Sequence, residues 1–411
     1  LIFLRLLWRG FQQRGYWRHL QERCGAFPRF DAGHCIWIHA VSVGEMRAAQ
    51  PLVRRLRLDY PAHPVLLSCM TVTGRETARE LYGDDVTCVY LPYDFFMLQS
   101  RLITHFHPRL LLVMETEIWP NLLAACHAHG VPALLVNARM SEKSSRGYAR
   151  FAPIRQLVRS SLASLHAVAA QSSSDASRLA ALGARNPVVT GNIKFDVAVD
   201  SALVARGQAW RLQLPAAKRV LLAASTRDGE ETILLDAYRQ LRANEAGANI
   251  LLVLVPRHPQ RFESVFQLVK SAGFNVDRRT LTGPSDELHV WLGDSMGEMA
   301  AYIAVSDVAF IGGSLLPLGG QNLIEACAQG KPVVMGPSTY NFSDASRLAL
   351  EAGAMQQGED AQAVMNLAGN LLLNDALRAE ASDAARKFAA VHAGATEKTM
   401  GLIAPLLNTG S

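Results

Sequence analysis

The chain has 411 residues, of which 49% are hydrophobic and 19% are charged. A chain of this length exceeds the usual size of one hydrophobic core, so we expect two domains. The composition excludes a disordered or low-complexity protein and is typical of a packed α/β protein. The six cysteines form no C-x-x-C pair, which argues against a zinc knuckle or a disulfide framework.

The amino-terminal end is strongly basic. Residues 1–30 carry six arginines and one acid, and residues 1–200 have a formal net charge of +8 against −3 for residues 201–411. The first residues, LIFLRLLW, are too few to span a bilayer, which takes about 20 apolar residues. Arginines among aromatic and aliphatic residues favour a helix in the headgroup layer of an anionic membrane, and a helix packed on the protein itself is the alternative. Because the chain does not begin with Met, an anchor upstream of Leu1 is also open.

From residue 35 onward, short apolar runs alternate with segments of helical period, which predicts parallel strands with crossover helices. The predicted strands are 35–41, 64–70, 88–92, 110–114, 133–137, 167–171 and 188–191, and then 220–224, 250–255, 274–276, 290–293, 308–312 and 332–335. We therefore predict an α/β protein of two Rossmann-like, doubly wound domains that face a central cleft. The predicted parts are a membrane-proximal segment at 1–22, a domain at 23–198, a linker at 199–217, a second domain at 218–385, and a helix at 386–411 that packs back on the first domain.

Ligands of such sheets bind outside the carboxyl ends of the strands, so the loops there are the candidate sites. The first predicted strand runs into HAVSVGE at residues 39–45. Gly44 allows close approach of a ligand, and Glu45 in the first helical turn is placed for general-base chemistry. The alternative is a local capping box of Ser42 and Glu45, which spacing alone favours.

The fourth predicted strand ends in METEIWPN at 114–121, where Glu115 and Glu117 stand beside Trp119. Carboxylates next to an aromatic residue suit a sugar, although acids at a helix start are the alternative. The fifth strand delivers Asn137 and Arg139 into a basic, hydroxyl-rich loop that suits a phosphorylated partner.

Glycines and cations follow the strands of the second half. These loops are STRDGEE at 225–231, PRHPQR at 256–261, DSMGEM at 294–299 and GGSLLPLGGQNLIE at 312–325. Backbone amides of glycines before a helix favour an anion such as phosphate, with tight turns as the alternative. No P-loop occurs and no G-x-G-x-x-G follows the first strand, which argues against ATP hydrolysis and dinucleotide redox chemistry.

Taken together, these motifs resemble the Kdo transferases of lipopolysaccharide synthesis. The resemblance rests on residues 39–45, 115–121, 191–194 (GNIK), 225–231, 256–258, 294–298 and 312–325, and it extends from about residue 15 to the end. It implies a GT-B glycosyltransferase that moves 3-deoxy-D-manno-oct-2-ulosonic acid (Kdo) from CMP-Kdo to an anionic lipid A precursor. The reaction would be inverting and metal-independent, without a cofactor, at the cytoplasmic face of the inner membrane.

The resemblance assigns the general base to Glu45 and the CMP site to the second half. The proposed substrate contacts are Ser42, Gly44, Glu115, Glu117, Asn137, Arg139, Lys194, Ser225, Thr226, Arg257, His258, Met296, Gly297, Glu298, Gly313, Ser314, Gln321, Asn322 and Glu325. Three positions depart from the family's usual residues, since S-T-H reads STR at 225–227, G-G-H-N reads GGQN at 319–322, and L-E-P reads IEA at 324–326. A role for the missing imidazoles is thereby weakened, but Arg227 can still meet a phosphate.

The residue types also suit this chemistry when they are considered without the family resemblance. A monophosphate leaving group and the sugar carboxylate need few counter-charges, and Lys194, Arg257 and the amides of 312–314 are candidates for them. No Asp-x-Asp or histidine cluster suggests a metal site, and nothing indicates a nucleic-acid partner. The rival interpretations are a UDP-GlcNAc 2-epimerase or another glycosyltransferase of this fold, and a non-catalytic protein of the membrane surface.

Overall fold

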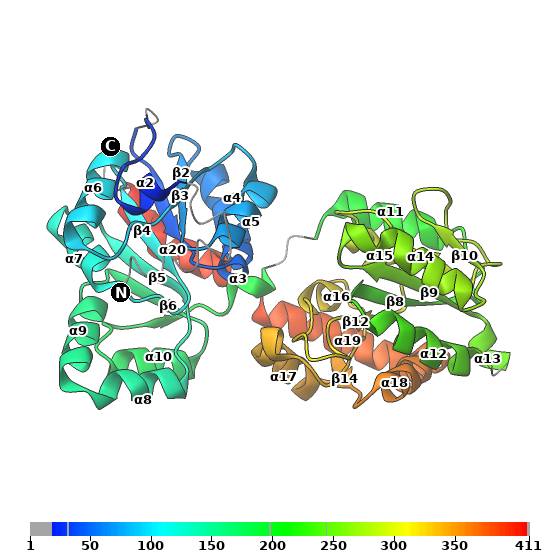
Figure 1. The fold of residues 1–411 in the computed structure, drawn as a ribbon. Helices are drawn as coiled ribbons and strands as arrows, with labels where there is room; N and C mark the ends of the chain where they lie inside the picture. The colour runs from blue at the N-terminus through cyan, green and yellow to red at the C-terminus, as the bar shows by residue number, and fades with distance from the viewer. Residues whose placement is uncertain (1–18, 31–32, 197–198, 244, 409–411) are drawn as a thin grey trace. The chain divides into compact units, whose positions relative to one another are not determined.

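The structure is a computed structural model that describes residues 19–30, 33–196, 199–243 and 245–408. The chain forms two compact units: unit 1 is Leu1–Asp196 with His392–Ser411, and unit 2 is Val197–Val391 (Figure 1). Most of the predicted membrane-proximal segment lies outside the described residues. Within the residues that the structure describes, no helix is long and apolar enough to cross a bilayer.

Unit 1 is built on a seven-stranded parallel sheet with the order β3-β2-β1-β4-β5-β6-β7 (Figure 1). Its strands are β1 (Ile36–His39), β2 (Val65–Cys69), β3 (Thr87–Tyr90), β4 (Leu110–Met114), β5 (Ala133–Ala138), β6 (Ala167–Ala170) and β7 (Val188–Val189). Its helices are α2 (Leu20–Arg23), α3 (Val43–Ala48), α4 (Gln50–Asp59), α5 (Val72–Tyr82), α6 (Phe96–Phe106), α7 (Pro120–Ala128), α8 (Glu142–Arg150), α9 (Ala152–Ala163), α10 (Ser173–Ala181), the 3₁₀ turn η2 (Ile193–Phe195) and α20 (Ala395–Asn408).

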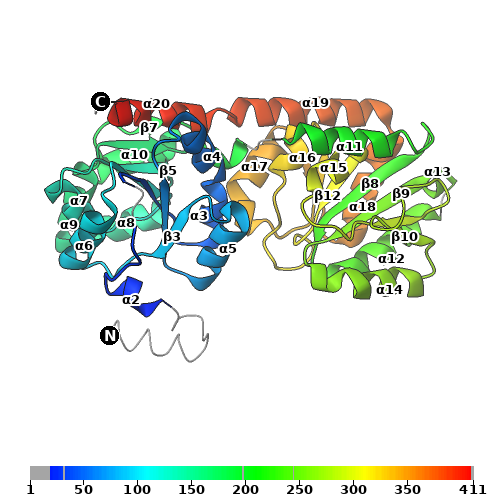
Figure 2. The same ribbon diagram turned by 90° about the horizontal axis from the view of Figure 1, so that it is seen from above.

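Helices cover both faces of this sheet, which explains why its central strands are apolar without alternation. Trp37 of β1 points into a core shared with α6, α7, α9 and α10. Its neighbours Ile36 and Ile38 point into the opposite core, shared with α3, α4 and α5 (Figure 2). Met400 and Ile403 of α20 complete that second core, so the end of the chain is an integral part of unit 1.

Unit 2 repeats the architecture with the parallel order β10-β11-β9-β8-β12-β13-β14. Its strands are β8 (Arg219–Thr226), β9 (Ile250–Pro256), β10 (Val276–Arg278), β11 (Val290–Leu292), β12 (Val308–Ile311), β13 (Val333–Met335) and β14 (Met355–Gln357). Its helices are α11 (Ser201–Arg211), α12 (Glu230–Arg242), α13 (Glu245–Ala248), α14 (Phe262–Ser271), α15 (Met299–Val305), α16 (Ile324–Ala328), α17 (Ser343–Glu351), α18 (Ala361–Leu373) and α19 (Asp375–His392), with 3₁₀ turns η3 (Pro259–Arg261) and η4 (Tyr340–Phe342). Two doubly wound parallel α/β sheets confirm the predicted fold class.

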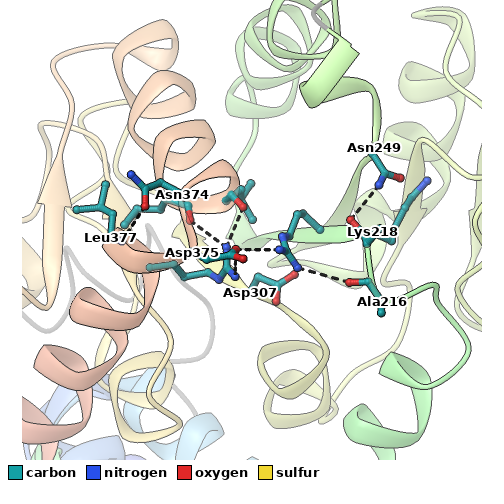
Figure 3. A network of polar contacts seen from close by, with 12 residues as sticks. Ala216, Lys218, Asn249, Asp307, Asn374, Asp375 and Leu377 are labelled. Carbon is teal, nitrogen blue, oxygen red and sulfur yellow. Dashed lines mark hydrogen bonds and ion pairs between the residues drawn. The ribbon is translucent and has the colours of Figure 1, made fainter.

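Two helices at the ends of unit 2 are held by specific contacts. Helix α11 lies in the segment predicted as a linker, and Gly207 lets it approach α15 so closely that a Cβ there would lie 2.2 Å from the Ala301 carbonyl oxygen. Helix α19 begins with Asp375, whose Oδ1 accepts hydrogen bonds from Arg219 at 2.8 Å and from Arg378 at 2.6 Å (Figure 3). The first contact ties α11 to α15, and the second ties α19 to β8 in the sheet of unit 2.

Candidate active site

The strand order of unit 1 reverses between β1 and β4, and the carboxyl ends of strands at such a switch point are where doubly wound sheets bind ligands. The two strands are parallel neighbours, with His39 opposite Val113. The loop after β1 therefore carries Glu45 to the same edge as the loop after β4, which carries Glu115 and Glu117. The sequence placed both motifs at strand ends, and the strand order of the sheet brings them to neighbouring strands.

Glu45 is held in a single orientation by a local cap. Ser42 is the N-cap of α3, and its Oγ accepts a hydrogen bond from the Glu45 N–H at 3.4 Å. In return, the Glu45 carboxylate accepts hydrogen bonds from the Val41 N–H at 2.6 Å and from the Ser42 hydroxyl at 3.2 Å. The capping interpretation therefore holds, and it leaves the carboxylate oriented at the switch point rather than free to rotate.

Burial makes this carboxylate a poor acid. Glu45 is only 8% exposed, and this desolvation raises its pKa from 4.5 to about 7, although the Val41 N–H opposes the rise. The negative charges of Glu117 and Glu115 raise the pKa further. A carboxylate whose pKa lies close to neutral pH is suited to accept a proton during catalysis.

The two acids after β4 are constrained differently. Glu115 has a left-handed backbone with φ 57°, which costs of order 1–3 kcal/mol in a residue with a side chain. Its Oε1 lies 2.8 Å from the Lys194 Nζ. Glu117 accepts a hydrogen bond from the Trp119 indole at 2.8 Å, while burial and the Glu115 charge raise its pKa. Backbone strain of this kind concentrates at ligand sites.

Lys194 is placed by residues far from it in the sequence. Asn137, buried at the end of β5 with φ 53°, accepts a hydrogen bond from the Ile193 N–H at 3.0 Å. Asp196, just after η2, accepts hydrogen bonds from the Gly394 and Thr396 N–H groups at the start of α20. The last helix of unit 1 therefore helps to hold the turn that carries Lys194.

His39 is a site residue that the sequence-based assignment omitted. The Trp37 indole donates to Ser68 Oγ at 2.7 Å, and the His39 Nδ1 lies 2.8 Å from that Oγ and 3.2 Å from the Ser68 carbonyl oxygen. Burial lowers the pKa of His39 to about 4, so the ring is neutral, and it meets Trp119 edge-on at 5.5 Å. The sequence does contain a signal for this residue, because His39 is a polar residue at the end of an otherwise apolar strand.

Two buried polar nitrogens at this edge lack hydrogen-bond partners within the described part of the chain: His39 Nε2 and Asn137 Nδ2. Native proteins rarely leave such atoms unsatisfied, because each costs about 1–3 kcal/mol. Both belong to strands next to β4, where Glu115 follows. Gly44 adds room here, since a Cβ at that position would meet only the Ser42 Oγ, at 3.9 Å. The edge is thus built to receive a polar ligand.

In unit 2, cations gather at the ends of β8 and β9. The Arg257 N–H donates to the Thr226 carbonyl at 2.9 Å, which joins the two loops. Burial lowers the pKa of His258, and the nearby charges of Arg227, Arg257 and Arg261 lower it further. Arg261 is paired with Glu231 and Asp228, and Ser225 has a left-handed backbone with φ 57°. Arg227 and Arg257 thus give this edge a positive charge that suits an anion, and His258 lies beside them with a lowered pKa.

The backbone amides of the glycine-rich loop after β12 bind a side chain of the protein itself. The fully buried Glu230 accepts hydrogen bonds from the amides of Gly313 at 2.6 Å, Leu315 at 2.9 Å and Arg227 at 2.9 Å. The Ser314 hydroxyl donates to the Ile311 carbonyl at 2.6 Å. Where the sequence led us to expect a phosphate against these amides, the structure has the carboxylate of Glu230, which fixes the loop to α12.

The other assigned residues of unit 2 have these positions. The Asn322 side chain accepts a hydrogen bond from the Ile324 N–H at 3.0 Å and donates one to Glu325 at 2.9 Å. The Gln321 N–H donates to the Gly312 carbonyl at 3.0 Å. Glu298 accepts hydrogen bonds from Arg206 and Arg279, and its pKa is lowered by Ser295 and these arginines against the effect of burial. Met296 is exposed, Gly297 follows it with φ 78°, and the Thr226 hydroxyl is buried against Glu231.

The assigned residues thus form two groups, one at the carboxyl edge of each sheet. Unit 1 brings together Ser42, Gly44, Glu45, Glu115, Glu117, Asn137, Arg139 and Lys194, and unit 2 carries the remainder. Arg139 is exposed, and its N–H donates to the Glu115 carbonyl at 3.4 Å. Over the ranges of chain given above, no three His, Cys, Asp or Glu side chains are arranged to hold a metal ion.

Comparison with known proteins agrees with this arrangement. Residues 18–197 match the family model of 3-deoxy-D-manno-octulosonic-acid transferase (kdotransferase). The chain is 42% identical to the 3-deoxy-D-manno-octulosonic acid transferase of Bordetella pertussis, with 97% of this chain and 95% of that protein covered. It is 35% identical to the transferase of that name from Haemophilus influenzae, with coverage of 95% and 92%.

Among solved structures, UDP-GlcNAc 2-epimerase from Neisseria meningitidis shares the fold, with a TM-score of 0.58 at 13% identity over 90% of this chain and 99% of that one. That likeness concerns the fold alone, because its sequence identity is low. The similarity to the transferases of Bordetella and Haemophilus extends over both units. The chain therefore belongs to the 3-deoxy-D-manno-octulosonic acid (Kdo) transferases, which are glycosyltransferases.

Proposed function

We propose that this protein transfers Kdo from CMP-Kdo to an anionic lipid A precursor in lipopolysaccharide synthesis, with Glu45 as the general base. The observation that carries the proposal is the buried, doubly hydrogen-bonded Glu45 carboxylate with a pKa of about 7 at the switch point of unit 1. Membership of the Kdo transferase family supports the sugar. The donor, the acceptor and the stereochemistry are our proposals.

The proposed step is a single displacement. An acceptor hydroxyl loses its proton to the Glu45 carboxylate while its oxygen attacks the anomeric carbon of Kdo, and the bond from that carbon to the CMP phosphate oxygen breaks. CMP leaves with the bonding electrons, and attack from the opposite side inverts the configuration. A base positioned in this way typically contributes about 10²–10⁴-fold to the rate.

The chain's own side chains can balance the charges. Arg227 and Arg257 are our candidates for the phosphate that becomes the leaving group, since the amides of the glycine-rich loop already hold Glu230. Lys194 beside Glu115 is the candidate for the carboxylate of Kdo, and Asn137 Nδ2 and His39 Nε2 are candidates for hydrogen bonds to sugar hydroxyls. We propose a reaction without a metal ion, because these cations offer the counter-charge that a monophosphate needs.

For the acceptor we propose the loops after β4 and β5, where Glu117 and Arg139 stand. An acceptor with phosphates and acyl chains places the enzyme at a membrane, and we propose the cytoplasmic face of the inner membrane. The basic segment 1–22 suits the headgroups of anionic lipids there, each Lys or Arg near such a surface contributing about 1 kcal/mol. Arginine content at the amino-terminal end is the observation behind this part of the proposal.

Mass spectrometry of a lipid A precursor incubated with CMP-Kdo and the protein tests the proposal directly. The expected product is heavier by one or more Kdo units, and it still forms when EDTA is present. A precursor of unchanged mass with active donor and acceptor would contradict the proposal.

Thermal unfolding with added nucleotides separates it from the epimerase alternative. A nucleotide present at about one hundred times its Kd adds about 2.7 kcal/mol to the stability of the folded chain. We expect this gain with CMP and not with UDP. Stabilisation by UDP alone would favour a UDP-sugar enzyme of the same fold.

A further inference from the structure

Helices α8 and α9 pack against each other as a hairpin in unit 1 (Figure 1), and much of this hairpin is exposed. No residue from 141 to 157 is buried. Phe151 is 60% exposed, Ile154 45% and Leu157 50%. A surface helix of a globular protein normally buries one apolar face. Large apolar side chains that stay exposed at the start of α9 therefore indicate a surface for binding a partner.

The hairpin is nonetheless firmly anchored at its base. Val158, Ser161 and Leu162 in the second half of α9 are buried, and Val158 and Leu162 belong to the core beneath α7. Tyr148 of α8 packs against the same core. Phe151, Ile154 and Leu157 follow one another at three-residue spacing, so they form an apolar stripe along the projecting first half of α9.

Basic residues surround this stripe. Between residues 142 and 159 the chain carries Lys143, Arg146, Arg150, Arg155 and Arg159 but only one acid, Glu142, for a net charge of +4. Glu142 is paired with Arg146, and the Arg150 guanidinium lies 5.9 Å from the Phe151 ring centroid. Apolar side chains framed by arginines are the composition of a helix that lies in the boundary between headgroups and acyl chains.

We propose that the α8–α9 hairpin docks on an anionic phospholipid bilayer. Phe151, Ile154 and Leu157 enter the acyl boundary, and the surrounding Lys and Arg side chains contact the lipid phosphates. The charge selects this partner over a second copy of the chain, because two hairpins of +4 would repel each other. The inference goes beyond the proposed function, since bilayer binding can be measured without any transfer.

Docking through this hairpin has a consequence for the candidate site. Helix α8 begins at Glu142, three residues after Arg139 and directly after the loop that leaves β5. The hairpin thus shares the sheet edge with Asn137 and Glu115. A membrane contact here brings that edge next to the lipid surface, where an acyl-chain substrate resides.

Co-sedimentation of the full chain with vesicles tests the proposal. The probe is phosphatidylglycerol mixed with phosphatidylethanolamine, compared with pure phosphatidylcholine. We expect Phe151→Ser, Ile154→Ser and Leu157→Ser together to weaken partition onto the anionic vesicles at least tenfold. The matched control replaces three exposed leucines of unit 2, Leu212, Leu281 and Leu350, by Ser, and it should change partition less than twofold. Equal partition of the hairpin variant and the wild type would overturn the proposal.

A charge-reversal variant tests the basic frame separately. Lys143→Glu, Arg150→Glu and Arg155→Glu should weaken binding at least tenfold at low salt, and the difference should shrink as salt screens the phosphates. The control reverses Lys270, Arg347 and Lys387, which are exposed on unit 2. If the hairpin variants bind vesicles normally but convert a dimer into a monomer in sedimentation velocity, a second copy is the occupant and the proposal fails.

An environment-sensitive dye checks insertion without relying on loss of binding. Cys24 is the exposed cysteine of the described chain, so the label is placed in a Cys24→Ser background at Leu157→Cys, with Leu212→Cys as control. We expect a blue shift on anionic vesicles for the hairpin label and none for the control. A hairpin label that stays in an aqueous environment while the protein is bound would contradict insertion of the stripe.

Discussion

Replacing Glu45 by Gln should make the stability of the protein rise with pH. Gln keeps the size of the side chain and can still accept the hydrogen bond of the Val41 N–H. What it removes is a carboxyl whose pKa is about 7 in the folded chain and about 4.5 in the unfolded chain. The folded state binds that proton more tightly, so this group contributes stability that is lost as pH rises from about 4.5 to about 7.

The size of the effect follows from the two pKa values. Their difference corresponds to about 3 kcal/mol in the free energy of unfolding, which is the contribution of Glu45 that is lost on going from acid to mildly alkaline pH. His39 acts in the opposite direction, because its pKa is about 4 in the folded chain against 6.5 in the unfolded chain. Its contribution is lost as pH falls from 6.5 toward 4. The two effects overlap and largely cancel in the wild type.

Urea unfolding at a series of pH values measures this directly. Relative to wild type, Glu45→Gln should gain about 3 kcal/mol of stability between about pH 4.5 and pH 8. The companion variant His39→Gln should show the opposite trend, with stability that falls by about the same amount as pH rises. A difference between Glu45→Gln and wild type that stays constant with pH would refute the burial argument for Glu45.

Three further changes test the remaining parts of the site. Gly44→Ala should raise the free energy of unfolding by about 0.5–1 kcal/mol, because Ala favours a helix and its Cβ has room there. The same substitution should lower the rate of Kdo transfer, because the added methyl group occupies the space proposed for the ligand. Urea unfolding and a transfer assay on the same variant measure the two effects. Arg257→Ala should raise the pKa of His258, measured by NMR titration, because one of the charges that lower this pKa is removed. The variant should also bind CMP more weakly. An unchanged His258 titration would show that Arg257 does not act on His258 as the positive edge requires. Glu230→Ala should destabilise unit 2 by about 3 kcal/mol or more, because three amides lose their buried acceptor. A variant as stable as the wild type would show that contacts other than those of Glu230 hold the Gly313 loop.

The sequence predicted which loops carry the candidate residues because its motifs follow strand ends. Parallel strands deliver their carboxyl ends to one edge, but it is the strand order, with β1 next to β4, that brings Glu45 near Glu115 and Glu117. The short strand β14 was missed. Its sequence, Met-Gln-Gln at an outer position of the sheet, has no apolar run to mark it.

Contacts between residues distant in the sequence were beyond prediction from local patterns. Glu230 looked like an acid in a first helical turn, and its bonds to amides more than 80 residues away appear only in the fold. Likewise, Asp196 caps a helix that begins about 200 residues later. The charge on Lys194 was visible in the sequence, but its ion pair with Glu115 depends on the turn that Asn137 and Asp196 hold together.

The pH dependence of Kdo transfer tests the role of Glu45 most directly. If the ionised carboxylate is the base, kcat/KM rises about tenfold per pH unit up to about pH 7 and then levels off. Glu45→Gln should lower kcat by about 10²–10⁴-fold. Asp175→Asn, which alters a similar cap at Ser172 on α10, should leave transfer intact. A Glu45→Gln enzyme with wild-type activity and an unchanged pH profile would contradict the account.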